Sequence, residues 1–148
     1  MQAVLFVGLQ GSGKSTFFRR RFFRTHVRVS LDLLRTRHRE GLFLDACLAS
    51  EQRFVVDNTN PTAEERARYI GPARTAKFSV VGYYFAAKCA DCVRRNAERS
   101  EVERVPEVAI YSTAKRLERP SLGEGFDQLF VVRLTENGFA VEDWRDEV

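Results

Sequence analysis

The chain lacks the features of disulfide-stabilised proteins and of membrane-spanning proteins. It has only three cysteines, an odd number, which argues against a disulfide framework. No apolar run is long enough to span a bilayer, and the run at 3–7 is too short for the core of a signal peptide. We therefore expect a cytoplasmic protein that does not contact a membrane.

Histidine is also scarce, which limits the metal sites that the chain can build. Cys89-Ala90-Asp91-Cys92 has the spacing of a redox pair or of half a zinc site. No second pair of this kind follows, and the two histidines, His26 and His38, show no partner pattern. Two small side chains at the start of a helix are the favoured interpretation, and a metal or redox role is the alternative.

Lysine is the third scarcity, because only four of the 24 lysine and arginine residues are lysines. Arginine binds phosphate with two parallel hydrogen bonds and stacks on nucleobases, so this bias suits a polyanionic partner. The formal net charge of +4 is weak support by itself. With 148 residues, 44% of them hydrophobic and 30% charged, the chain is expected to form one domain over 1–148.

What the chain does have is a glycine-rich segment directly behind its first apolar run. The segment 8–15 reads GLQGSGKS and matches the phosphate-binding P-loop pattern G-x-x-x-x-G-K-[ST]. Backbone amides in such a turn face an anion, and the following helix adds the positive end of its dipole. Lys14 is expected on the β- and γ-phosphates and Ser15 on Mg²⁺. The nucleotide-binding residues predicted here are Gly8, Gly11, Ser12, Gly13, Lys14, Ser15 and Thr16.

Apolar strands alternate with helical segments along the chain, which predicts an α/β protein with a mainly parallel five-stranded sheet flanked by helices. The expected strands are 2–7, 27–29, 53–56, 78–85 and 130–134, with 139–144 as a candidate edge element after a turn at 135–138. The expected helices are 14–24, a region after Asp32, 42–51, 61–76, 89–99 and one from 106 to before 120. Asn60 is predicted to cap the helix that begins at Pro61.

Two carboxylates follow strands and are therefore expected on the rim where the P-loop lies. Asp32 can accept a proton from an attacking hydroxyl, or it can simply cap a helix. Arg35, one turn on, can hold a substrate phosphate or pair with Asp32. Asp57 resembles a Walker B aspartate, which holds the Mg²⁺ shell, with an Asx turn as the alternative.

An arginine cluster after the fourth strand is interpreted as a lid over the phosphates. Its members are Arg94, Arg95, Arg99 and Arg104. A solvated helix face is the alternative. A second basic segment, 19–24, is interpreted as a helix whose core positions are Phe18 and Phe22, with arginines on its outer face, rather than as a nucleic-acid patch.

Taken together, these segments resemble the kinase domain of the 5′-OH polynucleotide kinases, the end-healing enzymes of phage and animal cells. The similarity covers about 4–132. Ser30 and Leu31 stand where the family has asparagine and arginine. The segments that carry the similarity are 8–16, 29–32, 57–61, 66–69, 96–99, 105–106 with Tyr111, and 120–126.

The resemblance implies a P-loop NTPase/kinase fold with an arginine-bearing lid, and transfer of the γ-phosphoryl group of ATP or another NTP to a 5′-hydroxyl end of DNA or RNA, with Mg²⁺. It implies Asp32 as general base and Arg99 on the transferring group. It places Arg35 near the acceptor's phosphate and Arg95 on the donor side. Two other classes compete with this function: a P-loop kinase for a sugar, nucleoside or antibiotic, and a non-catalytic ATP-binding module.

Overall fold

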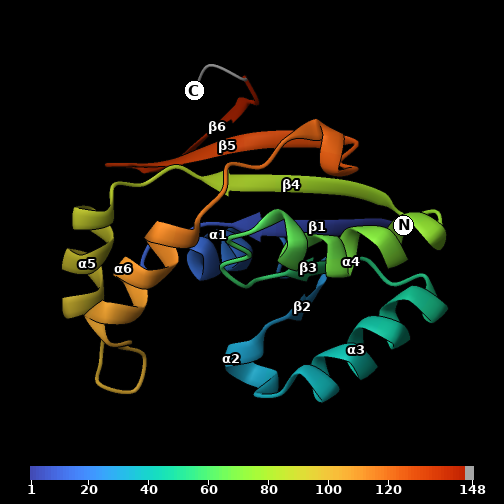
Figure 1. Ribbon diagram of the computed structural model, residues 1–148, viewed down its shortest axis with the longest axis horizontal. Coiled ribbons are helices and arrows are strands. Elements are labelled where there is room, and N and C mark those ends of the chain that lie inside the picture. The colour runs from blue at the N-terminus through green and yellow to red at the C-terminus, as the bar shows by residue number, and fades with distance from the viewer. Residues whose placement is uncertain (146–148) are drawn as a thin grey trace.

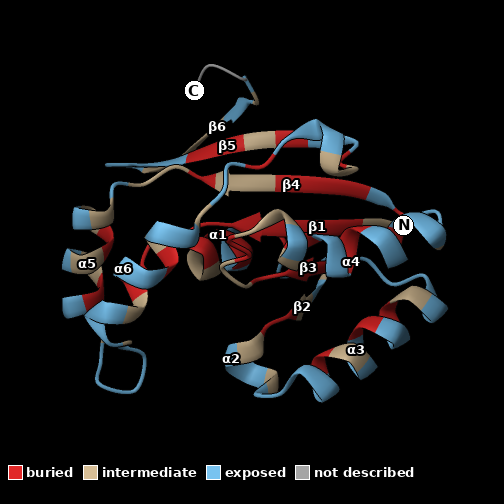
Figure 2. Cartoon of the chain, in the orientation of Figure 1, coloured by how far each residue is buried: buried red, intermediate tan, exposed pale blue. Residues whose placement is uncertain are grey.

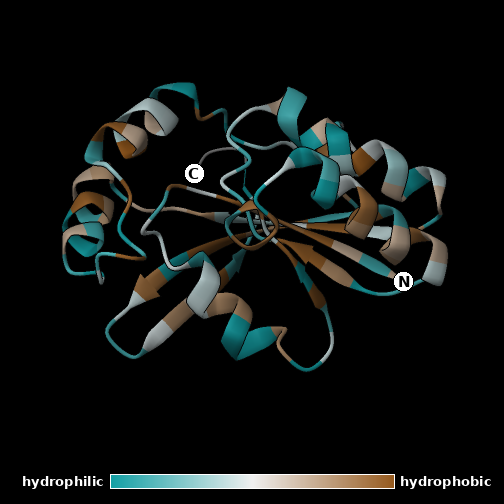
Figure 3. Cartoon of the chain, turned by 90° about the horizontal axis from the view of Figure 1, so that it is seen from below, coloured by the Kyte–Doolittle hydropathy of each residue, from teal (hydrophilic) through white to brown (hydrophobic). Residues whose placement is uncertain are grey.

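Five parallel strands and one antiparallel strand form a single sheet with helices on both faces in the computed structural model (Figures 1 and 3). The structure describes residues 1–145. The strands are β1 (Gln2–Val7), β2 (Val27–Val29), β3 (Phe54–Val56), β4 (Ser79–Phe85), β5 (Gln128–Thr135) and β6 (Gly138–Asp143). The helices are α1 (Lys14–Arg21), α2 (Leu31–Leu34), α3 (Arg37–Ser50), α4 (Ala63–Thr75), α5 (Cys89–Ala97), α6 (Glu107–Arg116) and the short 3₁₀ turn η1 (Leu122–Glu124).

The strand order is β2-β3-β1-β4-β5-β6, so the sheet has six strands and not the five predicted. The sixth strand comes from the candidate edge element, and it pairs antiparallel with β5. Thr135 pairs with Gly138, which leaves the two-residue turn 136–137 between the strands. Gly138 has a φ of 138°, a conformation that side-chain-bearing residues rarely adopt, and this allows the tight hairpin.

The sheet buries both of its faces, as the alternation along β1 shows (Figure 2). Ala3 and Leu5 pack into one cluster with α3 and α4. Val4 and Phe6 pack into a second cluster with α1 and the β5–β6 hairpin. Phe18 and Phe22 belong to that second cluster, which confirms them as core positions.

Several helix boundaries differ from the predictions because side chains serve as caps elsewhere. Helix α4 begins at Ala63, and its cap is Thr62, whose hydroxyl accepts from the Glu65 amide at 3.2 Å. The prediction of Asn60 as the cap is therefore wrong. Asn60 has a φ of 46° and donates its side-chain amide to the Phe6 carbonyl at 2.7 Å, which ties the end of β1 to the loop after β3.

The ends of three other helices differ from their predicted positions by two to five residues. Helix α3 starts at Arg37, five residues before the predicted start at 42, because the Thr36 hydroxyl caps it by accepting from the Arg39 amide. Helix α1 ends at Arg21 instead of 24, and α5 ends at Ala97 instead of 99. The ends of short helices depend on such local contacts, which sequence periodicity does not register.

Arg66 links two distant segments that carry the sequence resemblance. Its side chain is fully buried, and it makes two hydrogen bonds with Glu124, at 2.7 and 3.2 Å. It also donates to the carbonyls of Asn60 and Glu118. These contacts fasten α4 to η1 and give Arg66 a structural role. Among residues 1–145, no helix combines the length and apolar character needed to cross a membrane.

Candidate active site at the glycine-rich loop

The glycine-rich loop connects β1 to α1 at the carboxyl edge of the sheet, as predicted. Gly13 directly precedes α1 with a φ of 99°, and Gly11 has a φ of 82°. A Cβ on Gly11 would lie 2.7 Å from the Cys92 carbonyl oxygen, so α5 packs directly against the loop. In residues 1–145, the buried Ser12 hydroxyl is one of three buried side-chain polar atoms without a hydrogen-bond partner. An unpartnered polar atom of this kind, in a glycine-rich turn that leads into a helix, fits an anion.

Lys14 lies inside this loop and not in solvent. Its ammonium group donates to the carbonyls of Gly8 at 3.0 Å and Leu9 at 2.6 Å. Burial lowers the pKa of Lys14 to about 8, against the opposing pull of Asp57. Arg99 adds to the lowering, while Asp32 opposes it, so both predicted catalytic side chains act electrostatically on the same ammonium.

Ser15 and Asp57 meet as the sequence predicts. The Ser15 hydroxyl donates to Asp57 Oδ2 at 3.1 Å, and the Asp57 carboxylate is 4% exposed. The Asx turn considered for Asp57 is not its role. Arg28, which the sequence analysis did not single out, donates its Nε to the same Asp57 oxygen at 2.8 Å and its Nη2 to Ser15 Oγ at 3.1 Å.

Asp32 stands in the first turn of α2, and its side chain is exposed. The cap of α2 is Ser30, whose hydroxyl accepts from the Asp32 amide at 3.2 Å, so the capping role considered for Asp32 belongs to Ser30. Arg35 ends α2 with a φ of 74° and is also exposed. No ion pair joins Asp32 to Arg35, two residues within the described part of the chain. Both side chains are therefore available to solvent.

A buried polar network beneath α2 holds that helix in place, and sequence reasoning missed it. The Asn58 side-chain oxygen accepts from the Leu31 amide at 2.9 Å, and its NH₂ group donates to Glu40 at 2.8 Å. Glu40, 2% exposed, also accepts from Arg37 at 2.9 Å and from the Tyr69 hydroxyl at 2.8 Å. Burial, aided by the Glu40 charge, raises the pKa of Tyr69 and keeps its hydroxyl a donor.

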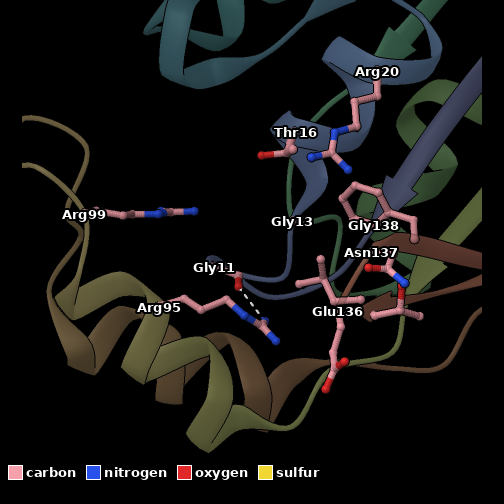
Figure 4. Close-up of a pocket in the computed structure, with 12 residues that line it drawn as sticks. Gly11, Gly13, Thr16, Arg20, Arg95, Arg99, Glu136, Asn137 and Gly138 are labelled. Carbon is pink, nitrogen blue, oxygen red and sulfur yellow. Dashed lines mark hydrogen bonds between the residues drawn. The ribbon is translucent and has the colours of Figure 1, made fainter.

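A cavity of about 470 Å³ opens beside the glycine-rich loop, between α5 and the β5–β6 hairpin (Figure 4). We call it the P-loop cavity. In the close-up, Arg99 extends toward it from the connection that follows α5, and Arg95 donates to the Gly11 carbonyl at 3.0 Å. The hairpin wall was predicted only as a turn followed by an edge element. The residues that line the cavity are Gly11, Gly13, Thr16, Arg20, Arg95, Arg99, Leu134, Thr135, Glu136, Asn137, Gly138 and Phe139.

The lid segment consists of α5, α6 and the connection 98–106, and it projects from one end of the sheet (Figure 1). The Asn96 side chain closes the base of the connection, with hydrogen bonds of 2.7 and 3.0 Å to the carbonyl and amide of Val105. Of the four arginines, Arg95 and Arg99 line the P-loop cavity. Arg94 pairs with Asp91 on the exposed helix surface, and exposed Arg104 donates to the Arg99 carbonyl.

The Cys89–Cys92 pair falls at the start of α5, as the favoured interpretation had it. Burial raises the pKa of the Cys92 thiol, which keeps it protonated and unreactive. Within residues 1–145 there is no cluster of three or more histidine, cysteine or acidic side chains that could hold a metal ion.

Comparison with known proteins supports a P-loop kinase domain for this chain. A family model described as an AAA domain matches residues 40–120, more than half of the chain, beginning after the glycine-rich loop. A bifunctional polynucleotide phosphatase/kinase of Schizosaccharomyces pombe is 29% identical over 129 residues. That match covers 84% of this chain and 32% of the yeast protein, so the chain spans about a third of its relative's length.

Solved structures share the fold at low sequence identity. Chaetomium thermophilum Kti12, in complex with ADP-AlF₃, superposes with a TM-score of 0.65 at 18% identity over 91% of this chain and 92% of its own. A gluconokinase from Sinorhizobium meliloti gives a TM-score of 0.62 at 16% identity over 91% of this chain and 83% of its own. The predicted α/β P-loop kinase fold is therefore confirmed.

Proposed function

The chain belongs to the AAA domain family, and on that premise we propose that it transfers the γ-phosphoryl group of ATP or another NTP to the 5′-hydroxyl end of DNA or RNA. The single observation that carries the proposal is the geometry of the glycine-rich loop. The Lys14 ammonium lies inside the loop on the carbonyls of Gly8 and Leu9, and the next residue, Ser15, meets the buried Asp57 carboxylate at 3.1 Å.

The triphosphate of the donor lies in the glycine-rich loop. Lys14 exchanges its two carbonyl hydrogen bonds for the β- and γ-phosphate oxygens, whose charge compensates for the burial of the ammonium. The rest of the nucleotide extends into the P-loop cavity, whose walls combine Phe139 and Leu134 with the polar hairpin tip. A volume of about 470 Å³ lies in the usual range for small-molecule sites.

Ser15 and Asp57 would hold Mg²⁺, since both supply oxygen and converge at 3.1 Å. Held there, Mg²⁺ would supply positive charge that compensates the β- and γ-phosphates. The donor set fits, although a guanidinium already contacts both oxygens.

Asp32 acts as the general base. Its exposed carboxylate accepts the proton of the 5′-hydroxyl, the hydroxyl oxygen bonds to the γ-phosphorus, and the β–γ bridging oxygen leaves with ADP. Arg99 stabilises the charge on the transferring group from the lid segment, and Arg95 supports the donor side through the loop. Arg35 binds the phosphate next to the acceptor's 5′ end.

A polynucleotide acceptor is favoured by the match to the yeast phosphatase/kinase, which extends over most of this chain. The arginine-rich composition and the exposure of Asp32 and Arg35 agree with an acceptor that approaches from solvent. A small-molecule acceptor is the second candidate. It is favoured by Leu31, which stands where the polynucleotide kinases have an arginine beside the base.

The deciding experiment is transfer from labelled ATP to DNA and RNA oligonucleotides that carry 5′-hydroxyl ends, with a panel of sugars and nucleosides in parallel. Labelling of oligonucleotides that Asp32→Ala abolishes would support the proposal. Labelling confined to a small molecule would favour the second candidate. Normal ATP binding without transfer to any acceptor would refute both.

A further inference from the structure

We propose that Arg28 is a built-in cation that holds the Ser15–Asp57 pair together and competes with the divalent metal for the same two oxygens. This inference rests on the proposed function in one respect only, the assignment of Ser15 and Asp57 as metal ligands. It does not depend on which acceptor is phosphorylated.

The contact geometry is that of a cation in a two-ligand site. Arg28 Nε lies 2.8 Å from Asp57 Oδ2, and Nη2 lies 3.1 Å from Ser15 Oγ, while Ser15 Oγ lies 3.1 Å from the same Asp57 oxygen. One guanidinium therefore bridges both oxygens. Because Asp57 is 4% exposed, its carboxylate would otherwise have the Ser15 hydroxyl as its one hydrogen-bond partner among the described residues.

The sheet register explains how Arg28 reaches this position. Arg28 pairs with Val55 across the parallel strands β2 and β3. Val55 packs in the cluster under α1, so Arg28 emerges on the same face as Ser15 in the first turn of α1. Val29, the next residue of β2, points to the opposite cluster. Strand alternation therefore places the Arg28 side chain on the face of the sheet that Ser15 occupies.

Arg28 cannot keep both contacts when a metal ion binds, because hard divalent cations take these oxygens directly or through their own waters and repel a guanidinium at contact distance. The Arg28 side chain is 22% exposed, so it has a path away from the pair. In the metal-free protein the competent site is populated only in the fraction of molecules where Arg28 has moved, which weakens the apparent metal affinity by that fraction.

The test is the affinity for Mn²⁺ alone, with free Mn²⁺ counted by electron paramagnetic resonance in the full chain without nucleotide. Arg28→Met should bind Mn²⁺ roughly tenfold more tightly than the native chain, because it no longer carries a competing charge. The same variant should melt at a lower temperature in chelator and regain stability when Mn²⁺ is added. If Arg28 had only a structural role, Arg28→Met would lower both the Mn²⁺ affinity and the melting temperature.

Arg53→Met is the matched control, since Arg53 is exposed next to β3 and contacts neither Ser15 nor Asp57. It should leave the Mn²⁺ affinity unchanged. Adding Asp57→Asn to Arg28→Met should remove the gain in Mn²⁺ affinity. That loss would assign the tighter binding to the Ser15–Asp57 pair. If Arg28→Met does not fold, Arg28→Lys supplies the comparison, because a single ammonium replaces the bridging fork and a smaller gain is expected.

An unchanged or weaker Mn²⁺ affinity in a folded Arg28 variant would overturn the proposal. Failure of transfer to every 5′-hydroxyl end would refute the proposed function and leave the Mn²⁺ result intact. The two failures are therefore distinguishable, because the binding measurement uses neither ATP nor an acceptor.

Discussion

Two segments flank the glycine-rich loop, and they are held in opposite ways. On one side, α2 rests on the buried network of Glu40, Asn58 and Tyr69, in which the Glu40 carboxylate accepts three hydrogen bonds. On the other side, the connection of the lid segment is exposed almost throughout and is closed at its base by the Asn96 side chain. Asp32, the predicted base, therefore lies on a helix that a buried network supports. Arg99, the predicted charge-stabilising residue, lies on an exposed connection with few supporting contacts.

The most severe loss of activity is expected from a substitution of Asp32. Asp32→Asn should lower turnover by about 10³-fold, because an amide cannot accept the hydroxyl proton. Affinity for ATP should stay nearly native, since Asp32 is exposed and caps no helix. Steady-state transfer and calorimetric ATP binding measure the two quantities. A parallel loss of ATP binding would show that Asp32 belongs to the donor site instead.

Arg99→Ala tests the other side of the comparison and should slow transfer by about 10²-fold with little change in ATP affinity. Arg94→Ala is its matched control, because Arg94 lies on the same lid segment but pairs with Asp91 at the surface. Single-turnover transfer should separate the two variants clearly. Equal rates for both would remove Arg99 from the reaction.

Glu40→Gln removes the support of α2, and Asn96→Ala removes the hydrogen bonds at the base of the connection 98–106. Replacing the buried carboxylate should destabilise the whole domain by about 2–3 kcal/mol, because an amide offers donors to groups that are themselves donors. Asn96→Ala should cost less, about 1 kcal/mol, and should loosen the connection 98–106 in particular. Urea unfolding gives the first quantity and hydrogen exchange of 98–106 the second. Equal losses of global stability would contradict the difference between the two sides.

Nucleotide binding should also depend on pH, with a smaller change than the two losses of turnover. The pKa of Lys14 is lowered to about 8 in the nucleotide-free protein, and phosphate should raise it again. Binding should therefore take up roughly half a proton at pH 8, and the affinity should fall by up to about tenfold per pH unit above that. Calorimetry in buffers of different ionisation enthalpy measures the uptake. A constant affinity between pH 7.5 and 9.5 would count against the buried ammonium, and Lys14→Arg should abolish the dependence.

The sequence predicted the parts of the site that a local pattern marks. The glycine-rich loop, Lys14 and Ser15 lie in one motif, and Asp57 follows a strand that alternation identifies. The Glu40 network was not predictable, because a glutamate on a helix gives no sign of burial until Asn58 and Tyr69 arrive from other elements. The cap at Asn60 was predicted wrongly, since its side chain is used by the Phe6 carbonyl across the sheet.

The order of apolar and polar residues was enough to determine the alternating strands and helices and the glycine-rich loop, because these depend on neighbours within a few residues. Tertiary structure alone decided that Arg28 lies on Asp57, 29 positions away, and that a hairpin wall completes the P-loop cavity. A three-residue strand such as β2 is too short to show which face each side chain takes. Only the register between strands and the packing of α1 on the sheet settle that choice.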